Sequence, residues 1–487
     1  MFSFLKENLW SILLGGNYVL VVLFSLLIVL KNKNPVKTLS FLFILAILPF
    51  FGIFIYYFFG QDYRKHKIFE KKYIFDNESL KRWSEKFGLN RVERFDFKKE
   101  YGDGAYKIYN LLRNNGKAVL TYENEVSILV NGEQKFERLK KDLENAEDHI
   151  HMEYFVFKDD EQGIKIIELL CKKAEQGVRV KLLYDDVGSA ISSKSKKLMT
   201  NSGVLHHAFL PVLFSNSTSK INYRNHRKIV VIDGKIGYLG GINIDQKYNN
   251  DYSNIRYWRD THLRIQGAAV GALQSSFFLS WNFAAKDDIE LEEKHFPKSR
   301  PIAQDPVAVQ IVASGPDTDW ENIMEAMFTA INTAKKRIYI TTPYLIPNSQ
   351  ILTALTTASR SGVDVRIIIP KKSDSWAAQY ATDSYIEQLA RSGIRIFRYH
   401  KGFVHAKTMI IDDYFSSIGT ANLDYRSFSL NFEINALIYN TRINQQMGEI
   451  FHNDLLDTEE VDYERWVERG LTRKIQESIS RLWAPLL

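Results

Sequence analysis

Two short motifs of identical spacing hold the residues of this sequence best suited to chemistry. In each, a histidine is followed after two, seven, fourteen and seventeen positions by a lysine, an aspartate, a glycine and an asparagine. The first motif consists of His226, Lys228, Asp233, Gly240 and Asn243, and the second of His405, Lys407, Asp412, Gly419 and Asn422. One such motif can arise by chance. Two copies with the same offsets indicate a duplicated unit and a site to which both halves contribute.

An apolar stretch rich in β-branched residues follows each histidine and lysine, at residues 229–232 and 408–411. Such stretches are typical of strands, in which side chains two positions apart point to the same face. Each motif is therefore expected to project an imidazole and an ammonium group together. If the halves pack around a pseudo-twofold axis, two histidines and two lysines converge on one pocket.

These groups suit phosphodiester chemistry. Two neighbouring lysines favour an anion between them, and a phosphate is the natural candidate. One imidazole can attack phosphorus to form a phosphohistidine, while the other protonates the leaving alcohol and later deprotonates the incoming one. The lysines and the amides of Asn243 and Asn422 can stabilise the charged oxygens. This design requires neither a metal ion nor a cofactor, and none is expected.

The paired motifs resemble the HKD motifs of the phospholipase D superfamily. The segments at 151–160, 183–189 and 422–428 narrow the resemblance, and together with the apolar amino terminus the whole chain is similar to the bacterial cardiolipin synthases. That family condenses two phosphatidylglycerol molecules into cardiolipin and releases glycerol. The resemblance implies an α/β fold with two repeated α/β/α sandwich domains about a pseudo-twofold axis. It departs from the family where serine is usual, at Gly241 and Thr420, which suggests that the halves bind phosphate unequally.

The resemblance also assigns roles. A carboxylate beyond each motif is expected to orient the histidine, with Glu433 serving the second half and Asp260 the first. Symmetry leaves open which histidine is the nucleophile, and the family favours His226, with His405 as the acid–base group. Asp233 and Asp412 belong to the candidate catalytic set, but their place where a strand meets a turn favours a structural role.

The amino-terminal region contains two uncharged runs, at residues 9–30 and 38–59. A run of this length spans about 33 Å as a helix, enough for one bilayer crossing. The pattern predicts a membrane anchor over 1–62 with two transmembrane helices. Lys6 and the basic cluster at 64–72 outnumber the three lysines of the intervening loop, which favours a multi-pass protein of the bacterial cell membrane with a cytoplasmic catalytic body.

The formal net charge of +7 suits an anionic partner, either lipid or nucleic acid. The two apolar runs favour lipid, so phosphatidylglycerol and anionic membrane lipid are the expected partners and nucleic acid is not expected. The single cysteine, Cys171, excludes an internal disulfide framework and is expected to be a buried side chain. The sequence leaves the oligomeric state open.

The soluble part of the chain repeats one order of elements. We expect a connector over 63–130, a first domain over 131–295 and a second over 310–487. Helices are predicted at 133–146, 163–176, 321–334 and 349–361, and strands at 149–157, 178–184, 337–344 and 363–369. Glycines 177 and 362 are expected to end the second helix of each half.

Two alternatives to phosphatidyl transfer stay open. Hydrolytic phospholipase D activity, which gives phosphatidic acid, shares the covalent intermediate and differs only in the acceptor. A superfamily nuclease fits the basic charge but has no evident use for an anchor. The carboxyl-terminal segment 471–486 has helical apolar spacing, typical of docking on the body or of lying on a membrane.

Overall fold

The structure is a computed structural model. It describes residues 9–31, 35–48, 51–53, 55–56, 97–115, 118–211, 223–253, 256–286, 289, 291–297, 305–482 and 484. The chain divides into a small unit, Met1–Phe75 with Leu213–Asn222, and a large unit, Asp76–Val212 with Tyr223–Leu487. Both histidine motifs of identical spacing lie in the large unit.

The small unit contains α2 (Leu9–Lys31) and α3 (Pro35–Ile47), which pack against each other. Ile28 of α2 and Phe41 and Leu45 of α3 form its buried cluster with Tyr56. Within the described residues, no helix combines the length and the apolar character needed to cross a membrane. The two spans predicted at 9–30 and 38–59 are therefore not confirmed.

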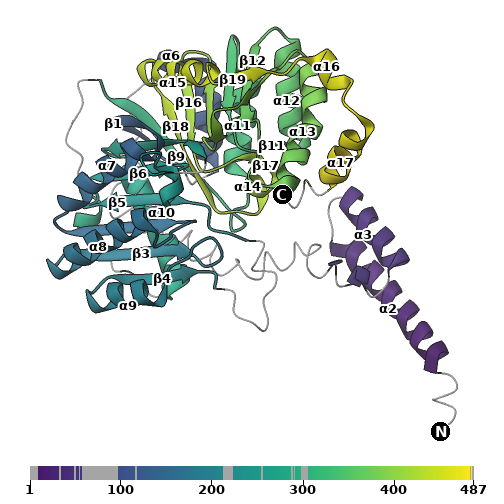
Figure 1. The fold of residues 1–487 in the computed structure, drawn as a ribbon, viewed down its shortest axis with the longest axis horizontal. Helices are drawn as coiled ribbons and strands as arrows, with labels where there is room; N and C mark the ends of the chain where they lie inside the picture. The colour runs from purple at the N-terminus through teal and green to yellow at the C-terminus, as the bar shows by residue number, and fades with distance from the viewer. Residues whose placement is uncertain are drawn as a thin grey trace. The chain divides into compact units, whose positions relative to one another are not determined.

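The large unit is built on one 15-stranded sheet (Figure 1). Its strand order is β19-β13-β12-β10-β15-β16-β18-β9-β1-β8-β6-β5-β2-β3-β4. Apart from β19, the order is symmetric about the antiparallel pair β1–β9, so β5 corresponds to β15 and β2 to β10. The predicted duplication is confirmed, and hydrogen bonds between β1 and β9 join the two halves into one sheet.

The strands of the first half are β1 (Leu120–Val130), β2 (His149–Tyr154), β3 (Arg179–Asp185), β4 (Leu205–Phe209), β5 (Lys228–Ile232), β6 (Ile236–Gly240), β7 (Tyr257–Arg259) and β8 (Thr261–Gln266). Those of the second half are β9 (Val307–Ser314), β10 (Arg337–Thr341), β11 (Leu345–Ile346), β12 (Asp364–Pro370), β13 (Arg395–Tyr399), β14 (Gly402–Val404), β15 (Thr408–Ile411), β16 (Phe415–Gly419), β17 (Leu423–Asp424), β18 (Glu433–Tyr439) and β19 (Thr458–Glu460).

Helices cover both faces of the sheet. The first half contributes α7 (Asn131–Glu144), α8 (Glu161–Glu175), α9 (Ser193–Asn201) and α10 (Val270–Ala285). The second contributes α11 (Asn322–Thr333), α12 (Ser349–Arg360), α13 (Trp376–Arg391), α14 (Tyr425–Ser429), α15 (Thr441–Leu455), α16 (Tyr463–Val467) and α17 (Leu471–Leu482), and α6 (Phe97–Asn114) packs on α11.

Side chains of β5 show how the layers form. Val230 and Ile232 join the cluster under α7 and α8, whereas Ile229 and Val231 join the cluster under α10. A strand buried on both faces needs a continuous apolar run, which is why the two motifs are followed by four apolar or β-branched residues.

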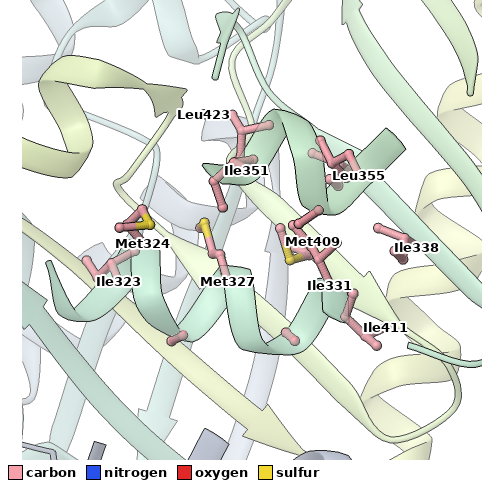
Figure 2. Close-up of a cluster of buried hydrophobic side chains, with 14 of the residues drawn as sticks. Ile323, Met324, Met327, Ile331, Ile338, Ile351, Leu355, Met409, Ile411 and Leu423 are labelled. Atoms are coloured by element: carbon pink, nitrogen blue, oxygen red, sulfur yellow. The ribbon is translucent and has the colours of Figure 1, made fainter. Parts of the chain in front are cut away.

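The corresponding strand of the second half is anchored in the same way. Figure 2 shows Met324, Met327 and Ile331 of α11 in one cluster with Met409 and Ile411 of β15. All of these side chains are buried. Because β15 begins directly after Lys407, this packing fixes the position of the second motif.

Observed elements agree with the predicted ones to within a few residues at most ends. The segment 63–130, predicted as a connector, contributes α6 and the central strand β1, while 63–96 lies outside the described residues. Gly177 and Gly362 follow α8 and α12 with φ of 92° and 94°, as the helix-ending role requires. Cys171 is buried in α8.

Candidate active site

Each motif histidine is held by backbone of the opposite half. The backbone N–H of His226 donates to the carbonyl of Phe432 at 2.9 Å, and that of His405 donates to the carbonyl of Arg259 at 2.7 Å. The strands β14 and β7, which precede His405 and Asp260, also pair with each other in parallel. These exchanges bring the two histidines to the junction of the halves.

The two carboxylates pair across this junction. His226 Nδ1 lies 2.9 Å from Glu433 Oε2, and His405 Nδ1 lies 2.7 Å from Asp260 Oδ2. The expectation that each carboxylate serves the histidine of its own half is therefore wrong. The reason is that Glu433 directly follows Phe432, the backbone partner of His226, and Asp260 stands in the same relation to His405.

Burial keeps both imidazoles neutral. It lowers the pKa of His226 to about 4 against the opposing attraction of Glu433, and it lowers the pKa of His405 well below the ordinary value. Each neutral ring donates its Nδ1 proton to its carboxylate, so Nε2 carries a free lone pair. Both histidines thus have the tautomer that a nucleophile or a general base needs.

The carboxylates differ from each other. Burial raises the pKa of Asp260 to about 6, although Lys407 opposes the shift. Burial also acts to raise the pKa of Glu433, but His226 and its hydrogen bond outweigh this, so that pKa lies below the ordinary value. Glu433 is therefore the more firmly ionised of the two.

Lys228 and Lys407 are both buried, and each ammonium donates to the carbonyl oxygen of the histidine two positions earlier. Burial lowers the pKa of Lys407 to about 8 and that of Lys228 well below its ordinary value, and repulsion between the two lysines adds to the effect on Lys228. A bound anion would offset both causes, so the site is suited to a phosphate.

The motif aspartates lie elsewhere. The Asp233 carboxylate accepts backbone N–H groups at the start of β2, those of residues 147–149, and Asp412 accepts those of residues 335–337 at the start of β10. Each stands five residues beyond its motif lysine, roughly 16 Å along the strand. The structure places neither carboxylate among the reacting groups, in agreement with the structural role inferred from their position.

Both motif asparagines are buried and hydrogen-bonded within the protein. Asn243 accepts from the Val156 N–H at 3.1 Å and donates to the Tyr248 hydroxyl at 2.7 Å. Asn422 donates to Asp424 Oδ2 at 2.9 Å. Their binding of phosphate stays a prediction.

The residue that follows the motif glycine lies next to a carboxylate in each half. The Thr420 hydroxyl donates to Glu433 Oε2 at 2.5 Å. In the other half, a Cβ atom at Gly241 would lie 2.1 Å from Asp260 Oδ1, so the carboxylate fills the space that a side chain there would need. The difference between Gly241 and Thr420 thus gives the two carboxylates different surroundings. The sequence analysis did not predict this effect on Asp260 and Glu433.

Aromatic rings that the sequence analysis did not single out flank the histidines. The ring of Phe155 lies 4.9 Å from that of His226. Around His405, the rings of Tyr248, Trp258 and Phe403 lie at 5.6, 5.7 and 5.8 Å. Phe155 could have been identified from the sequence, because it lies in the segment 151–160 that resembles the family.

A buried carboxylate also positions the first motif. Asp185, at the end of β3, accepts from the backbone N–H of Asn225 at 2.9 Å and pairs with Arg224 at 3.2 Å. The side chain of Asn225 in turn donates to Glu153 at 2.6 Å. This network fixes the residues directly before His226. Among the described residues, no cluster of histidine, cysteine and carboxylate side chains is arranged to hold a metal ion.

Two imidazoles, each with a carboxylate on Nδ1, and two buried lysines form an arrangement suited to phosphodiester chemistry. The family model described as "Cardiolipin synthase, PLD-like domain" matches residues 139–266 and 327–455, and the model "Phospholipase_D-nuclease N-terminal" matches 19–61. The chain belongs to the cardiolipin synthase family of phospholipase D-like proteins.

Relatives match over nearly the whole chain. The protein named Major cardiolipin synthase ClsA of Bacillus subtilis (strain 168) is 39% identical over 98% of this chain and 99% of its own length. Cardiolipin synthase of Listeria monocytogenes serotype 4a (strain HCC23) is 39% identical over 96% and 99%. The crystal structure of phosphatidylserine synthase from Haemophilus influenzae Rd KW20 has a TM-score of 0.59 and 15% identity, covering 78% of this chain and 100% of that one, and shows the shared fold.

Proposed function

We propose that the protein acts as a cardiolipin synthase, which transfers the phosphatidyl group of one phosphatidylglycerol to another and releases glycerol. The observation that carries this proposal is the pair of crossed histidine–carboxylate contacts around two buried lysines. The full-length relatives named cardiolipin synthase support the choice of lipid substrate.

In the first step, His226 Nε2 attacks the phosphorus of one phosphatidylglycerol. The bond from phosphorus to the glycerol oxygen breaks, and protonated His405 gives its proton to that oxygen. The bound phosphate favours this protonated form because it brings negative charge next to His405, and Asp260 stabilises the imidazolium. Lys228 and Lys407 neutralise the oxygens of the phosphate.

In the second step, a hydroxyl of the second phosphatidylglycerol attacks the phosphatidylhistidine. His405, now neutral, takes the proton of that hydroxyl, the phosphorus–nitrogen bond breaks, and cardiolipin forms. Glu433 accepts the hydrogen bond from Nδ1–H of His226 in both steps, so Nε2 is the nitrogen that forms the bond to phosphorus and later releases it. The reaction is reversible because both steps exchange similar phosphodiester and phosphoramidate bonds.

Water instead of a lipid hydroxyl would give phosphatidic acid, and this hydrolytic activity is the second candidate. The aromatic rings of Phe155, Tyr248, Trp258 and Phe403 favour transfer, since apolar surface beside the histidines disfavours water there. A nuclease activity has no comparable support.

We further propose that the small unit attaches the protein to the bacterial cell membrane with the catalytic body on the cytoplasmic side. Apolar side chains of α2 and α3 are exposed in the described structure and would be shielded by lipid. They include Leu20, Val22, Leu23, Leu26, Val29, Leu39, Phe43 and Ile47. The basic residues at 64–72 support the cytoplasmic side.

The experiment that tests the reaction uses purified full-length protein, labelled phosphatidylglycerol in mixed micelles and excess EDTA, with products separated by thin-layer chromatography. Cardiolipin and free glycerol are expected, in equal amounts. Phosphatidic acid alone would replace transfer by hydrolysis while keeping the histidine chemistry. No turnover would contradict the proposal and direct attention to other phosphodiesters.

A further inference from the structure

The last helix of the chain packs on the body through its polar side. In α17, Glu477 and Ser480 are each 2% exposed, and the helix lies against α13. Arg469, just before the helix, pairs with Glu477 at 2.7 Å, and Arg473 pairs with Asp383 of α13 at 3.0 Å. Docking on the body, one of the two arrangements that the sequence left open for this segment, is observed, but the inward side is the charged one.

The apolar side of α17 points outward. Leu471, Ile475, Ile479 and Leu482 are 74%, 49%, 50% and 80% exposed. Their spacing of four, four and three positions places them on one face of the helix, here named the outer stripe. A surface helix ordinarily buries such a stripe.

The helix is fixed in this orientation. The side chains of Glu477 and Asp383 are 3% and 1% exposed, and both are paired with arginines. Turning the outer stripe inward would separate Arg473 from the buried Asp383, which would keep only Gln379 as a partner, and this loss is unfavourable. The outer stripe is therefore presented to whatever lies outside the body.

The charge around the outer stripe indicates the partner. Lys474 and Arg481 lie next to it on one side of the helix, where the Arg481 guanidinium also stacks on Tyr385 of α13, and Glu477, the one acidic residue of α17, is turned inward. Apolar residues with basic neighbours are the pattern of helices that lie in the interface of an anionic bilayer.

We propose that α17 lies on the surface of an anionic membrane with its outer stripe among the lipid headgroups and upper acyl chains. This contact holds the large unit on the bilayer that supplies its substrate, so the inference rests on the proposed lipid function. It adds to that function a second membrane contact, formed by the catalytic body itself and separate from α2 and α3.

The test uses full-length protein in vesicles that contain phosphatidylglycerol. With Cys171→Ala as the background, single cysteines at Ile475 and Ile479 are labelled with a polarity-sensitive fluorophore. Thr357, an exposed residue of α12, gives the control. Labels on the outer stripe are expected to shift to the blue and to be quenched by nitroxide lipids, whereas the label at 357 is quenched by aqueous iodide.

Equal iodide quenching at all three positions would overturn the inference. Protection from both quenchers would also overturn it, because the outer stripe would then be covered by a second copy or by another part of this chain. These readouts do not depend on turnover, so they remain informative if the proposed reaction fails.

Replacing apolar residues of the outer stripe by charged ones tests the membrane contact through enzyme activity. The double variant Ile475→Glu with Ile479→Glu is expected to form cardiolipin several-fold more slowly on vesicles and to cleave a water-soluble phosphodiester at the unchanged rate. Thr357→Glu serves as the control and should alter neither rate. Unchanged rates on vesicles in the double variant would contradict the proposed contact.

Discussion

His226 is held by Glu433, a residue 207 positions further along the chain, with 2.9 Å between Nδ1 and Oε2. The reciprocal contact joins His405 to Asp260 at 2.7 Å. Each half thus supplies a histidine to one pair and a carboxylate to the other. Neither half contains a complete pair, so the sheet that joins the halves through β1 and β9 is a condition for the chemistry.

Replacement of either histidine should abolish cardiolipin formation. His226→Ala removes the nucleophile, and His405→Ala removes the group that protonates the leaving glycerol. General acid catalysis alone contributes about 10²–10⁴-fold, so the second variant should retain at most a trace of activity. Labelled donor followed by rapid quenching should give covalent label only in proteins that retain His226. Substantial turnover in either variant would exclude the two-histidine mechanism.

Glu433→Gln should lower kcat by about 10²–10⁴-fold with little change in KM, because an amide neither fixes the Nδ1 proton of His226 nor stabilises its charged form. Steady-state kinetics on micelles would measure both constants. The exposed Glu449→Gln of α15 is the control and should leave both unchanged. A rise in KM alone would indicate that Glu433 serves substrate binding instead.

The pH profile of kcat/KM should be bell-shaped, because one group of the free enzyme sets the acid limb and another sets the alkaline limb. Asp260, with a pKa of about 6, must be ionised to stabilise the imidazolium that His405 becomes when phosphate binds, so activity rises as the pH passes this value. Lys407, with a pKa of about 8, must be charged to bind phosphate, so activity falls above it. His226 is already neutral above about 4 and adds no limb in this range. Initial rates from pH 5 to 10 would define kcat/KM.

Lys407→Arg distinguishes the origin of the alkaline limb. Arginine keeps its charge throughout this range, so the fall near pH 8 should vanish even if the maximal rate is lower. If the fall persists at the same pH in this variant, another group controls it.

Much of the fold follows from local patterns. Apolar and β-branched residues recur in the strands predicted at 149–157, 178–184, 337–344 and 363–369, and Gly177 and Gly362 end helices with positive φ, so these elements were predicted from their own residues. The duplication followed from the equal spacing of the motifs. The central position of β1 did not, because it results from pairing with β8 and β9 far along the chain.

The sequence predicted the residues of the site but not which carboxylate contacts which histidine. The types and spacing of His226 and His405 indicate chemistry without knowledge of the fold. Which carboxylate meets which histidine depends on backbone contacts between the halves, those of His226 with Phe432 and of His405 with Arg259. A sequence offset within one half contains no information about such contacts.

Asp412→Ala should reduce stability more than chemistry. Its carboxylate accepts three backbone N–H groups before β10, and leaving such donors unsatisfied costs about 1–3 kcal/mol each. Because these N–H groups are only partly buried and water can replace part of the carboxylate, we expect a total loss of about 2–4 kcal/mol and activity per folded molecule within about tenfold of the parent. Asp412→Asn, which keeps one acceptor and tolerates the φ of 47°, should lose less. Denaturant unfolding in detergent would measure this, and a stable but inactive alanine variant would contradict it.

Thr420 should act through Glu433. Thr420→Val removes the hydroxyl that donates to Oε2 at 2.5 Å while keeping the side-chain volume, so the pKa of Glu433 should rise and kcat should fall about tenfold. KM should change little, because the hydroxyl contacts the carboxylate and not the phosphate. Thr420→Ser restores the donor and should recover the rate. The loss of kcat should therefore appear only in the valine variant, and equal loss in both variants would indicate a packing role.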